Sequence, residues 1–140
     1  MKKTVKTFLL IVLSMLMSLN SISTYAVETE NQILPRLSHM DGASFVFSAE
    51  DTGGYIEVDY TGYSESFLAA KLTVKVEKRF LLVFWNEVGT WSSTSTELYG
   101  YFSHVMPLNG SGKYRATFTL EVLGKDGTLD VVDMVIESDY

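Results

Sequence analysis

The segment from Tyr114 to Val122 alternates between apolar and polar side chains without a break. Its apolar members are Tyr114, Ala116, Phe118, Leu120 and Val122. Polar side chains fill the positions between them: Arg115, Thr117, Thr119 and Glu121. A period of two places successive side chains on opposite faces of an extended chain. The segment therefore predicts a β-strand with one buried and one solvated face, as in an antiparallel sheet that covers a core.

The same period recurs along the chain after residue 27, with turn-forming residues between the repeats. Two further sets are Ile56-Val58-Tyr60 and Leu72-Val74-Val76. Seven strands are predicted, at 43–49, 54–61, 66–79, 83–91, 97–107, 113–123 and 128–138. No segment sustains helical periodicity over the ~11 residues that a helix prediction needs. Seven short strands over roughly 100 residues are typical of an antiparallel β-sandwich.

Tyr114 sharpens this prediction. In immunoglobulin-like sandwiches a tyrosine near the start of the penultimate strand ties the preceding corner to the backbone, two residues before a buried core position. Ala116 stands at that core position, and Trp85 lies 13 residues after Leu72, close to the spacing of the core tryptophan in those domains. We predict an all-β, antiparallel immunoglobulin-like sandwich with Trp85, Tyr114 and Ala116 as structural residues, and a β-barrel as the alternative. The sequence contains no cysteine and therefore no disulfide.

The predicted last strand changes phase. Leu129 and Val131 share one parity, whereas Val132, Met134 and Ile136 share the other. Both sets can face the core only if one residue is inserted between them, so the pattern predicts a β-bulge near Val131.

The N-terminal segment has the composition of a secretory signal peptide. Lysines at positions 2, 3 and 6 precede an apolar run of 12 residues from Phe8 to Leu19, and Ala26 stands at the expected cleavage point. A membrane anchor is the alternative, but the run is shorter than the roughly 17 to 25 apolar residues of a spanning helix. We expect a signal peptide at 1–26, a flexible leader at 27–40 and a β-sandwich domain at 41–140.

Charge narrows the range of partners. Loss of three lysines with the signal peptide leaves 8 of the 11 Lys and Arg against 17 Asp and Glu, a formal net charge of −9. Binding to nucleic acid or to an anionic membrane depends on clustered positive charge. We therefore expect a secreted, extracellular protein that binds no nucleic acid and has no stable membrane insertion after cleavage. A small exported domain without cysteine favours a bacterial source.

The apolar run Phe80-Leu81-Leu82-Val83-Phe84 is the sharpest candidate for a contact surface. In an extended strand, about half of five consecutive apolar side chains must face away from a single core. Three interpretations stay open: a strand buried on both faces, a protein or self-association interface, and a loop tip that touches a membrane. The acidic balance of the chain disfavours the third. Phe80, Leu81, Leu82 and Phe84 form the candidate interaction surface.

Aromatic residues suggest a second surface. Trp91, Tyr99 and Tyr101 lie near the hydroxyl-rich segment Ser92–Thr96. Aromatic faces flanked by hydroxyl and carboxylate groups hold sugar rings in many sandwich modules, so these three residues form a candidate glycan platform. Tyrosine and threonine are also favoured in strands for packing reasons alone.

Nothing in the sequence indicates catalysis or a cofactor. His39 and His104 have no nucleophile motif beside them and no second histidine or cysteine at metal-ligand spacing. The segment from Asp126 to Asp130 imitates the start of a calcium loop, but Val131 occupies the position that needs glycine. We predict no catalytic, cofactor or metal site. A weak calcium site and a hydrolytic pair among the carboxylates stay open as minor alternatives.

Two short motifs carry a resemblance to a known group of proteins. They are Trp85-x-x-Val88-x-x-Trp91, after a long charged strand, and Gly112-Lys113-Tyr114-Arg115. With the signal peptide and the cysteine-free sandwich, the chain resembles the small uncharacterised secreted proteins of low-GC Gram-positive bacteria. The resemblance implies fold and compartment, and no activity. The chain departs from it before Trp85, where that family has a polar turn and this chain has the apolar run.

These observations together predict a secreted bacterial protein with a non-catalytic binding role. The leading interpretation is contact with a protein, or with a second copy of the chain, through the apolar run from Phe80 to Phe84. The alternative is a carbohydrate-binding module that uses exposed tyrosine and tryptophan. A hydrolase is the least favoured interpretation.

Overall fold

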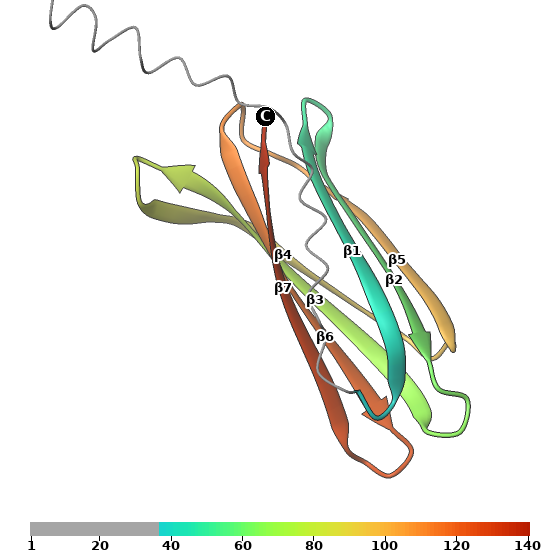
Figure 1. Ribbon diagram of the computed structural model, residues 1–140. Coiled ribbons are helices and arrows are strands. Elements are labelled where there is room, and N and C mark those ends of the chain that lie inside the picture. The colour runs from blue at the N-terminus through green and yellow to red at the C-terminus, as the bar shows by residue number, and fades with distance from the viewer. Residues whose placement is uncertain (1–36) are drawn as a thin grey trace, which may run out of the picture. The chain divides into compact units, whose positions relative to one another are not determined.

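The computed structural model describes residues 37–140 (Figure 1). The expected signal peptide and residues 27–36 of the expected leader lie outside the described residues. The described part contains seven strands: β1 (Met40–Glu50), β2 (Gly53–Gly62), β3 (Phe67–Phe80), β4 (Phe84–Ser95), β5 (Tyr99–Met106), β6 (Lys113–Gly124) and β7 (Leu129–Asp139). Each predicted strand corresponds to one of them. The largest difference is at the end of β4, which continues to Ser95.

The strands form two antiparallel sheets, visible as two layers in Figure 1. One sheet has the order β1-β2-β5 and the other the order β4-β3-β6-β7. In the lettering of immunoglobulin domains these sheets are A-B-E and C′-C-F-G, so the fourth strand extends the sheet of the third. The architecture confirms the predicted all-β, antiparallel immunoglobulin-like sandwich of seven strands without a disulfide.

The core lies between the sheets and is built from alternate strand residues. Every second residue of β6 is buried, as the period-two pattern requires. Its Phe118 ring meets the ring of Phe45 on β1 edge to face, with the centroids 5.4 Å apart. Burial of one such large side chain contributes roughly 1.5–3 kcal/mol. The largest fully buried side chains are Tyr114, Phe118, Met40, Ile56, Leu72, Leu120, Val58, Val74, Val76 and Val122.

Tyr114 closes the corner that leads into β6. Its side chain is fully buried, and its hydroxyl donates a hydrogen bond to the carbonyl oxygen of Gly110 at 2.5 Å. Ala116 is also fully buried and lies opposite Val76 of β3. This is the geometry of a tyrosine corner, in which the hydroxyl satisfies a carbonyl a few residues upstream and fixes the loop.

Trp85 departs from the expectation of a core tryptophan. It lies near the start of the edge strand β4, opposite Arg79, and is only partly buried. The guanidinium carbon of Arg115 lies 4.3 Å from its ring centroid, so the ring packs beneath a cation and not in the core. Leu72 belongs to β3, which is strand C. The spacing from Leu72 to Trp85 therefore joins strands C and C′ and does not identify a core position.

The predicted bulge near Val131 is wrong. Strand β7 pairs with β6 in one unbroken register, from Asp139 opposite Lys113 to Leu129 opposite Leu123. With no inserted residue, the two parities stay on opposite faces. Val132 is buried, whereas Leu129 and Val131 are exposed on the outer face of the sheet.

Packing at the N-terminal side begins before residue 41, the expected start of the domain. Met40 opens β1 and is fully buried, and the His39 side chain is buried beside it. One carboxylate oxygen of Asp130 accepts the backbone N–H of Ser38 at 2.8 Å and that of His39 at 2.6 Å. Gly124 makes room for the His39 ring, because a Cβ on that glycine would lie 2.3 Å from it. The last residues assigned to the leader thus belong to the domain.

Candidate functional site

The apolar run from Phe80 to Phe84 forms the apex of the β3–β4 hairpin. Phe80 ends β3, Phe84 begins β4, and residues 81–83 form the turn between them. All five side chains are exposed, with fractions from 54% for Phe80 to 78% for Leu82. We call these five residues the hairpin apex. They are contiguous, apolar and in solvent, which is a rare arrangement on a soluble protein surface.

The hairpin apex lies beyond the part of the hairpin that covers the core. Val76 and Glu77 are buried, and the register between β3 and β4 shifts between them, which leaves Val88 of β4 as the extra residue. From Lys78 onward no residue of β3 is buried. A bulge bends a strand, and Figure 1 shows this end of the hairpin projecting away from the rest of the sandwich. The interpretation of the run as a strand buried on both faces is therefore wrong.

Leu81 has a backbone conformation that suits glycine. Its φ is 55°, and it is the one non-glycine residue with a positive φ within residues 37–140. This left-handed region costs a leucine roughly 1–2 kcal/mol, whereas glycine adopts it freely. The side chain that causes this cost is 69% exposed, so it does not stabilise the core. A strained backbone with an exposed apolar side chain indicates a role outside the fold.

Arg79 secures the backbone of the turn. Its Nε donates a hydrogen bond to the carbonyl oxygen of Leu82 at 2.8 Å, and its Nη2 donates to the same oxygen. The guanidinium therefore covers a carbonyl that the turn leaves free. Such a group would otherwise need water or a polar partner.

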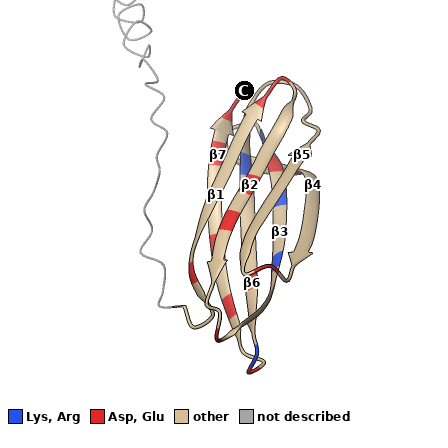
Figure 2. Ribbon diagram, turned by 90° about the vertical axis from the view of Figure 1, so that its right-hand side faces the viewer, with Lys and Arg blue, Asp and Glu red and all other residues tan. Residues whose placement is uncertain are grey.

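Basic side chains gather at the base of the hairpin apex. Lys78 and Arg79 immediately precede Phe80, and neither forms an ion pair among the described residues. The Lys78 ammonium instead donates a hydrogen bond to the carbonyl oxygen of Asn109, in the loop before β6. Every Lys and Arg of residues 37–140 lies in β3, β6 or the loop after β6, and none lies in the β1-β2-β5 sheet (Figure 2). Sequence reasoning used the net charge of the whole chain and missed the two adjacent basic residues before the apex. The signal for them was the dipeptide Lys78-Arg79 next to the run.

The buried acid at this end of β3 is neutralised by partners, whereas Glu87, opposite it on β4, is exposed and has no ion pair among the described residues. Glu77 is buried, accepts a hydrogen bond from Arg115 Nε at 2.7 Å and lies 3.3 Å from Lys75 Nζ. The Arg115 hydrogen bond, with a smaller contribution from Lys75, holds the pKa of Glu77 below its usual value, although burial opposes this. Glu77 therefore stays ionised and matched by two cations.

The three residues of the candidate glycan platform do not share a face. Tyr99 and Tyr101 point outward from β5 and are 75% and 57% exposed. Trp91 instead packs against the core, and its ring stacks on His104 with the centroids 4.6 Å apart and the planes 3° apart. His104 alternates with the outward tyrosines along β5 and so faces inward. One face of Trp91 is therefore covered.

The two tyrosines lie on the outer side of the β1-β2-β5 sheet. Tyr99 is opposite Thr61 of β2, and Tyr101 is opposite Asp59. The residue between them, Gly100, leaves space for the inward Tyr60 ring, since a Cβ there would lie 2.0 Å from it. This face thus carries two exposed aromatic rings with a hydroxyl and a carboxylate beside them.

The loop after β6 uses its polar groups internally. One oxygen of Asp126 accepts the backbone N–H and the hydroxyl of Thr128, and these bonds hold the pKa of Asp126 below its usual value. His39 Nε2 lies 2.6 Å from the Thr128 hydroxyl, while Asp130 accepts backbone N–H groups of the N-terminal segment. Within residues 37–140 no group of three or more acidic or histidine side chains is arranged to hold a metal ion.

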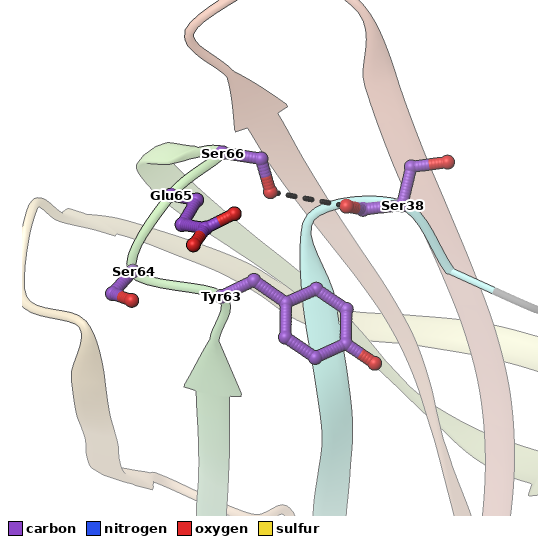
Figure 3. Close-up of a pocket in the computed structure, with 5 residues that line it drawn as sticks. All are labelled: Ser38, Tyr63, Ser64, Glu65 and Ser66. Atoms are coloured by element: carbon purple, nitrogen blue, oxygen red, sulfur yellow. Dashed lines mark hydrogen bonds between the residues drawn. The ribbon is translucent and has the colours of Figure 1, made fainter.

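A shallow polar hollow lies at the β2–β3 turn (Figure 3). It has a volume of about 380 Å³ and is lined by Ser38, Tyr63, Ser64, Glu65 and Ser66. The Ser66 hydroxyl donates to the Ser38 carbonyl at 3.0 Å across it. The lining consists of three serines, one carboxylate and a single aromatic ring, that of Tyr63, unlike the mostly apolar pockets that bind small molecules.

Comparison with known proteins gives no family for this chain. No protein-family model matches it, and no curated protein sequence matches it significantly. The described part also holds no helix with the length and apolar character needed to cross a bilayer.

Proposed function

We propose that this chain is an exported, non-catalytic binding protein and that the hairpin apex is its contact surface. The observation that carries the proposal is the exposure of five consecutive apolar side chains at the end of a projecting hairpin. Water disfavours such a surface, so a chain that keeps it gains from covering it with a partner. The strained Leu81 supports the same conclusion, because a glycine there would serve the fold better.

Export is supported by the sequence of the first 26 residues. The lysines, the apolar run and Ala26 stand in the order of a signal peptide. A domain that folds without cysteine suits a bacterial exported protein. We propose that the protein acts outside the cell.

Glycan binding is the second candidate function, and one observation favours it. Tyr99 and Tyr101 are exposed side by side on one sheet face, next to Asp59 and Thr61. Aromatic rings flanked by such groups suit the apolar and hydroxyl faces of a sugar ring. Trp91 is not available to this platform, so the two tyrosines alone would carry it.

A fluorescence titration separates the two candidates. The chain has two tryptophans, so Trp91→Phe leaves Trp85, next to the hairpin apex, as the sole emitter. In this background the apex is altered by Leu81→Gly with Leu82→Ser, and the tyrosine face by Tyr99→Ala with Tyr101→Ala. Soluble polysaccharides and rising concentrations of the protein itself serve as ligands, with the mass followed by sedimentation.

Association that disappears with the apex variant, and survives in the tyrosine variant, supports the proposed function. Polysaccharide binding that disappears only with the tyrosine variant establishes the second candidate in its place. Binding that neither variant changes overturns both.

A further inference from the structure

We propose that the hairpin apex docks on the surface of an anionic lipid bilayer, with its apolar side chains in the interfacial layer. This inference rests on the proposed function and names the partner class of the same surface. It concerns a reversible contact made by one turn, and no segment of the domain spans the membrane.

The size and shape of the hairpin apex favour a lipid surface over a protein. A standard protein interface takes roughly 20–30 residues from each partner, whereas the apex offers five on a projecting turn. A lipid interface needs no matching surface. Amphipathic segments bind it by burying apolar side chains roughly 5–10 Å deep, which is the rise of two or three residues along a strand.

Part of the backbone of the hairpin apex already has hydrogen-bond partners within the domain. Unsatisfied carbonyl and N–H groups are costly in lipid. Phe80 and Phe84 are paired in the antiparallel ladder, and the Leu82 carbonyl accepts two hydrogen bonds from the Arg79 guanidinium. That guanidinium fixes the turn and lies within hydrogen-bond distance of Leu82, so its charge goes with the turn and holds the apex at the level of the lipid headgroups.

The charges nearest the hairpin apex are net positive, although the chain as a whole is acidic: Lys78 and Arg79 stand against one exposed acid, Glu87 of β4. Lys78 and Arg79 have no acidic partner among residues 37–140, and Glu77 is already held by Arg115 and Lys75. The β1-β2-β5 sheet has no Lys or Arg, and the β4-β3-β6-β7 sheet carries acids as well as bases, so the positive charge is local to the end of β3 (Figure 2). A basic side chain near an anionic bilayer raises affinity by about fivefold. Trp85 adds an aromatic ring at the same level, as is common at membrane interfaces.

The experiment uses the full chain and vesicles of phosphatidylcholine with about 30 mol% phosphatidylglycerol. In the Trp91→Phe background, lipids with a bromine on the acyl chain near the headgroup should quench Trp85. Leu81→Gly with Leu82→Ser should weaken partitioning roughly tenfold or more, because two exposed leucine side chains are lost. Vesicles of phosphatidylcholine alone should bind several-fold more weakly.

A matched control removes two apolar side chains from another exposed site. Leu129→Ser with Val131→Ser changes the outer face of β7, at the end of the sheet opposite to that where Lys78 pairs with Tyr114. This variant should partition as the wild type does. A Trp85→Phe chain, which keeps Trp91 stacked on His104, should show little quenching.

Three results would overturn the inference, and they bear differently on the proposed function. If the wild type does not bind vesicles but self-associates through the hairpin apex, the partner is a second copy and the proposed function stands. If it neither binds vesicles nor associates through the apex, both fail. If the wild type and the apex variant bind vesicles equally without Trp85 quenching, another segment such as Phe8–Leu19 holds the lipid; the inference then fails, and the association measurement alone decides the proposed function.

Discussion

The two halves of the β3–β4 hairpin both carry large apolar side chains, but these are buried in one half and exposed in the other. On one side of the bulge, Leu72, Val74 and Val76 are fully buried beneath the other sheet. On the other side, Phe80 and Phe84 are exposed although the two strands still pair there. Apolar side chains therefore form a core only where a second sheet covers them. Where the hairpin projects past that layer, the same residue types become a surface.

The first prediction tests this comparison with two phenylalanines: Phe118, which lies opposite Val74 in the covered part of the sheet, and Phe84 at the hairpin apex. Phe118→Ala should lower the free energy of unfolding by roughly 3–5 kcal/mol, because it opens a cavity under Phe45. Phe84→Ala should change it by less than about 0.5 kcal/mol, since its side chain is exposed. Urea denaturation of both variants measures the two values. Equal losses would show that the hairpin apex contributes to the core.

The second prediction concerns the corner before β6. Tyr114→Phe should lower the free energy of unfolding by about 1 kcal/mol, because the Gly110 carbonyl loses the hydroxyl donor while the ring still fills its site. Tyr101→Phe is the control, as its ring is exposed on the outer face of β5. Thermal unfolding compares the two. A loss from Tyr101→Phe as large as that from Tyr114→Phe would contradict a special role for the corner.

The third prediction concerns acid stability at the boundary between the two halves. The pKa of Glu77 is lowered from 4.5 in the folded chain. Its ionised form therefore stabilises the fold above the ordinary carboxyl pKa, and this stability is lost as the pH falls through the lower folded value. Glu77→Gln should cost roughly 1–2 kcal/mol at pH 7 and less at pH 3.

Chemical denaturation between pH 3 and pH 7 measures this dependence. Glu121→Gln is the matched control on the same sheet, because its ion pair with Lys71 is more exposed and should matter little. If the cost of Glu77→Gln is independent of pH, the contact with Arg115 does not stabilise the ionised form.

The fourth prediction has the opposite sign and the smallest size. Leu81→Gly should leave the free energy of unfolding unchanged or raise it by up to about 1 kcal/mol, because relief of the left-handed strain offsets the greater freedom of glycine in the unfolded chain. Leu82→Ser should leave it unchanged. A clear loss of stability in Leu81→Gly would mean that the leucine serves the fold and would weaken the functional argument for the apex.

The fold was largely predictable from the sequence. Apolar residues at every second position marked β2, β3 and β6, because each of these strands has one face on the core and one in solvent. Tyr114 marked the corner because its hydroxyl acts on a backbone group only four residues away. Local patterns such as these do not depend on which strands become neighbours.

The wrong predictions concern features that depend on which strands become neighbours. The spacing from Leu72 to Trp85 was assigned to the wrong pair of strands, because the number of residues between two positions does not show which strands they occupy. The bulge near Val131 was predicted because apolar residues were assumed to face the core, yet Leu129 and Val131 stay outside. In both cases the outcome depended on the position of another strand, and the sequence of one segment does not predict that position.

The candidate site was predictable in part. The run from Phe80 to Phe84 stood out in the sequence, but its three interpretations differed only in what covers it. The net charge of the chain is acidic and gave no indication of the local basic pair before the run. The glycan platform was proposed from residues close in sequence, and the sandwich places Trp91 inside and the two tyrosines outside.

The sequence by itself determined that the chain forms paired strands around an apolar core, because side-chain alternation is a property of each strand alone. It also determined which residues are unusual: an apolar run at 80–84 and two basic residues before it. Only the tertiary structure decided that this run is a surface. Exposure depends on whether the opposite sheet reaches the end of the hairpin, and here the hairpin projects away from it.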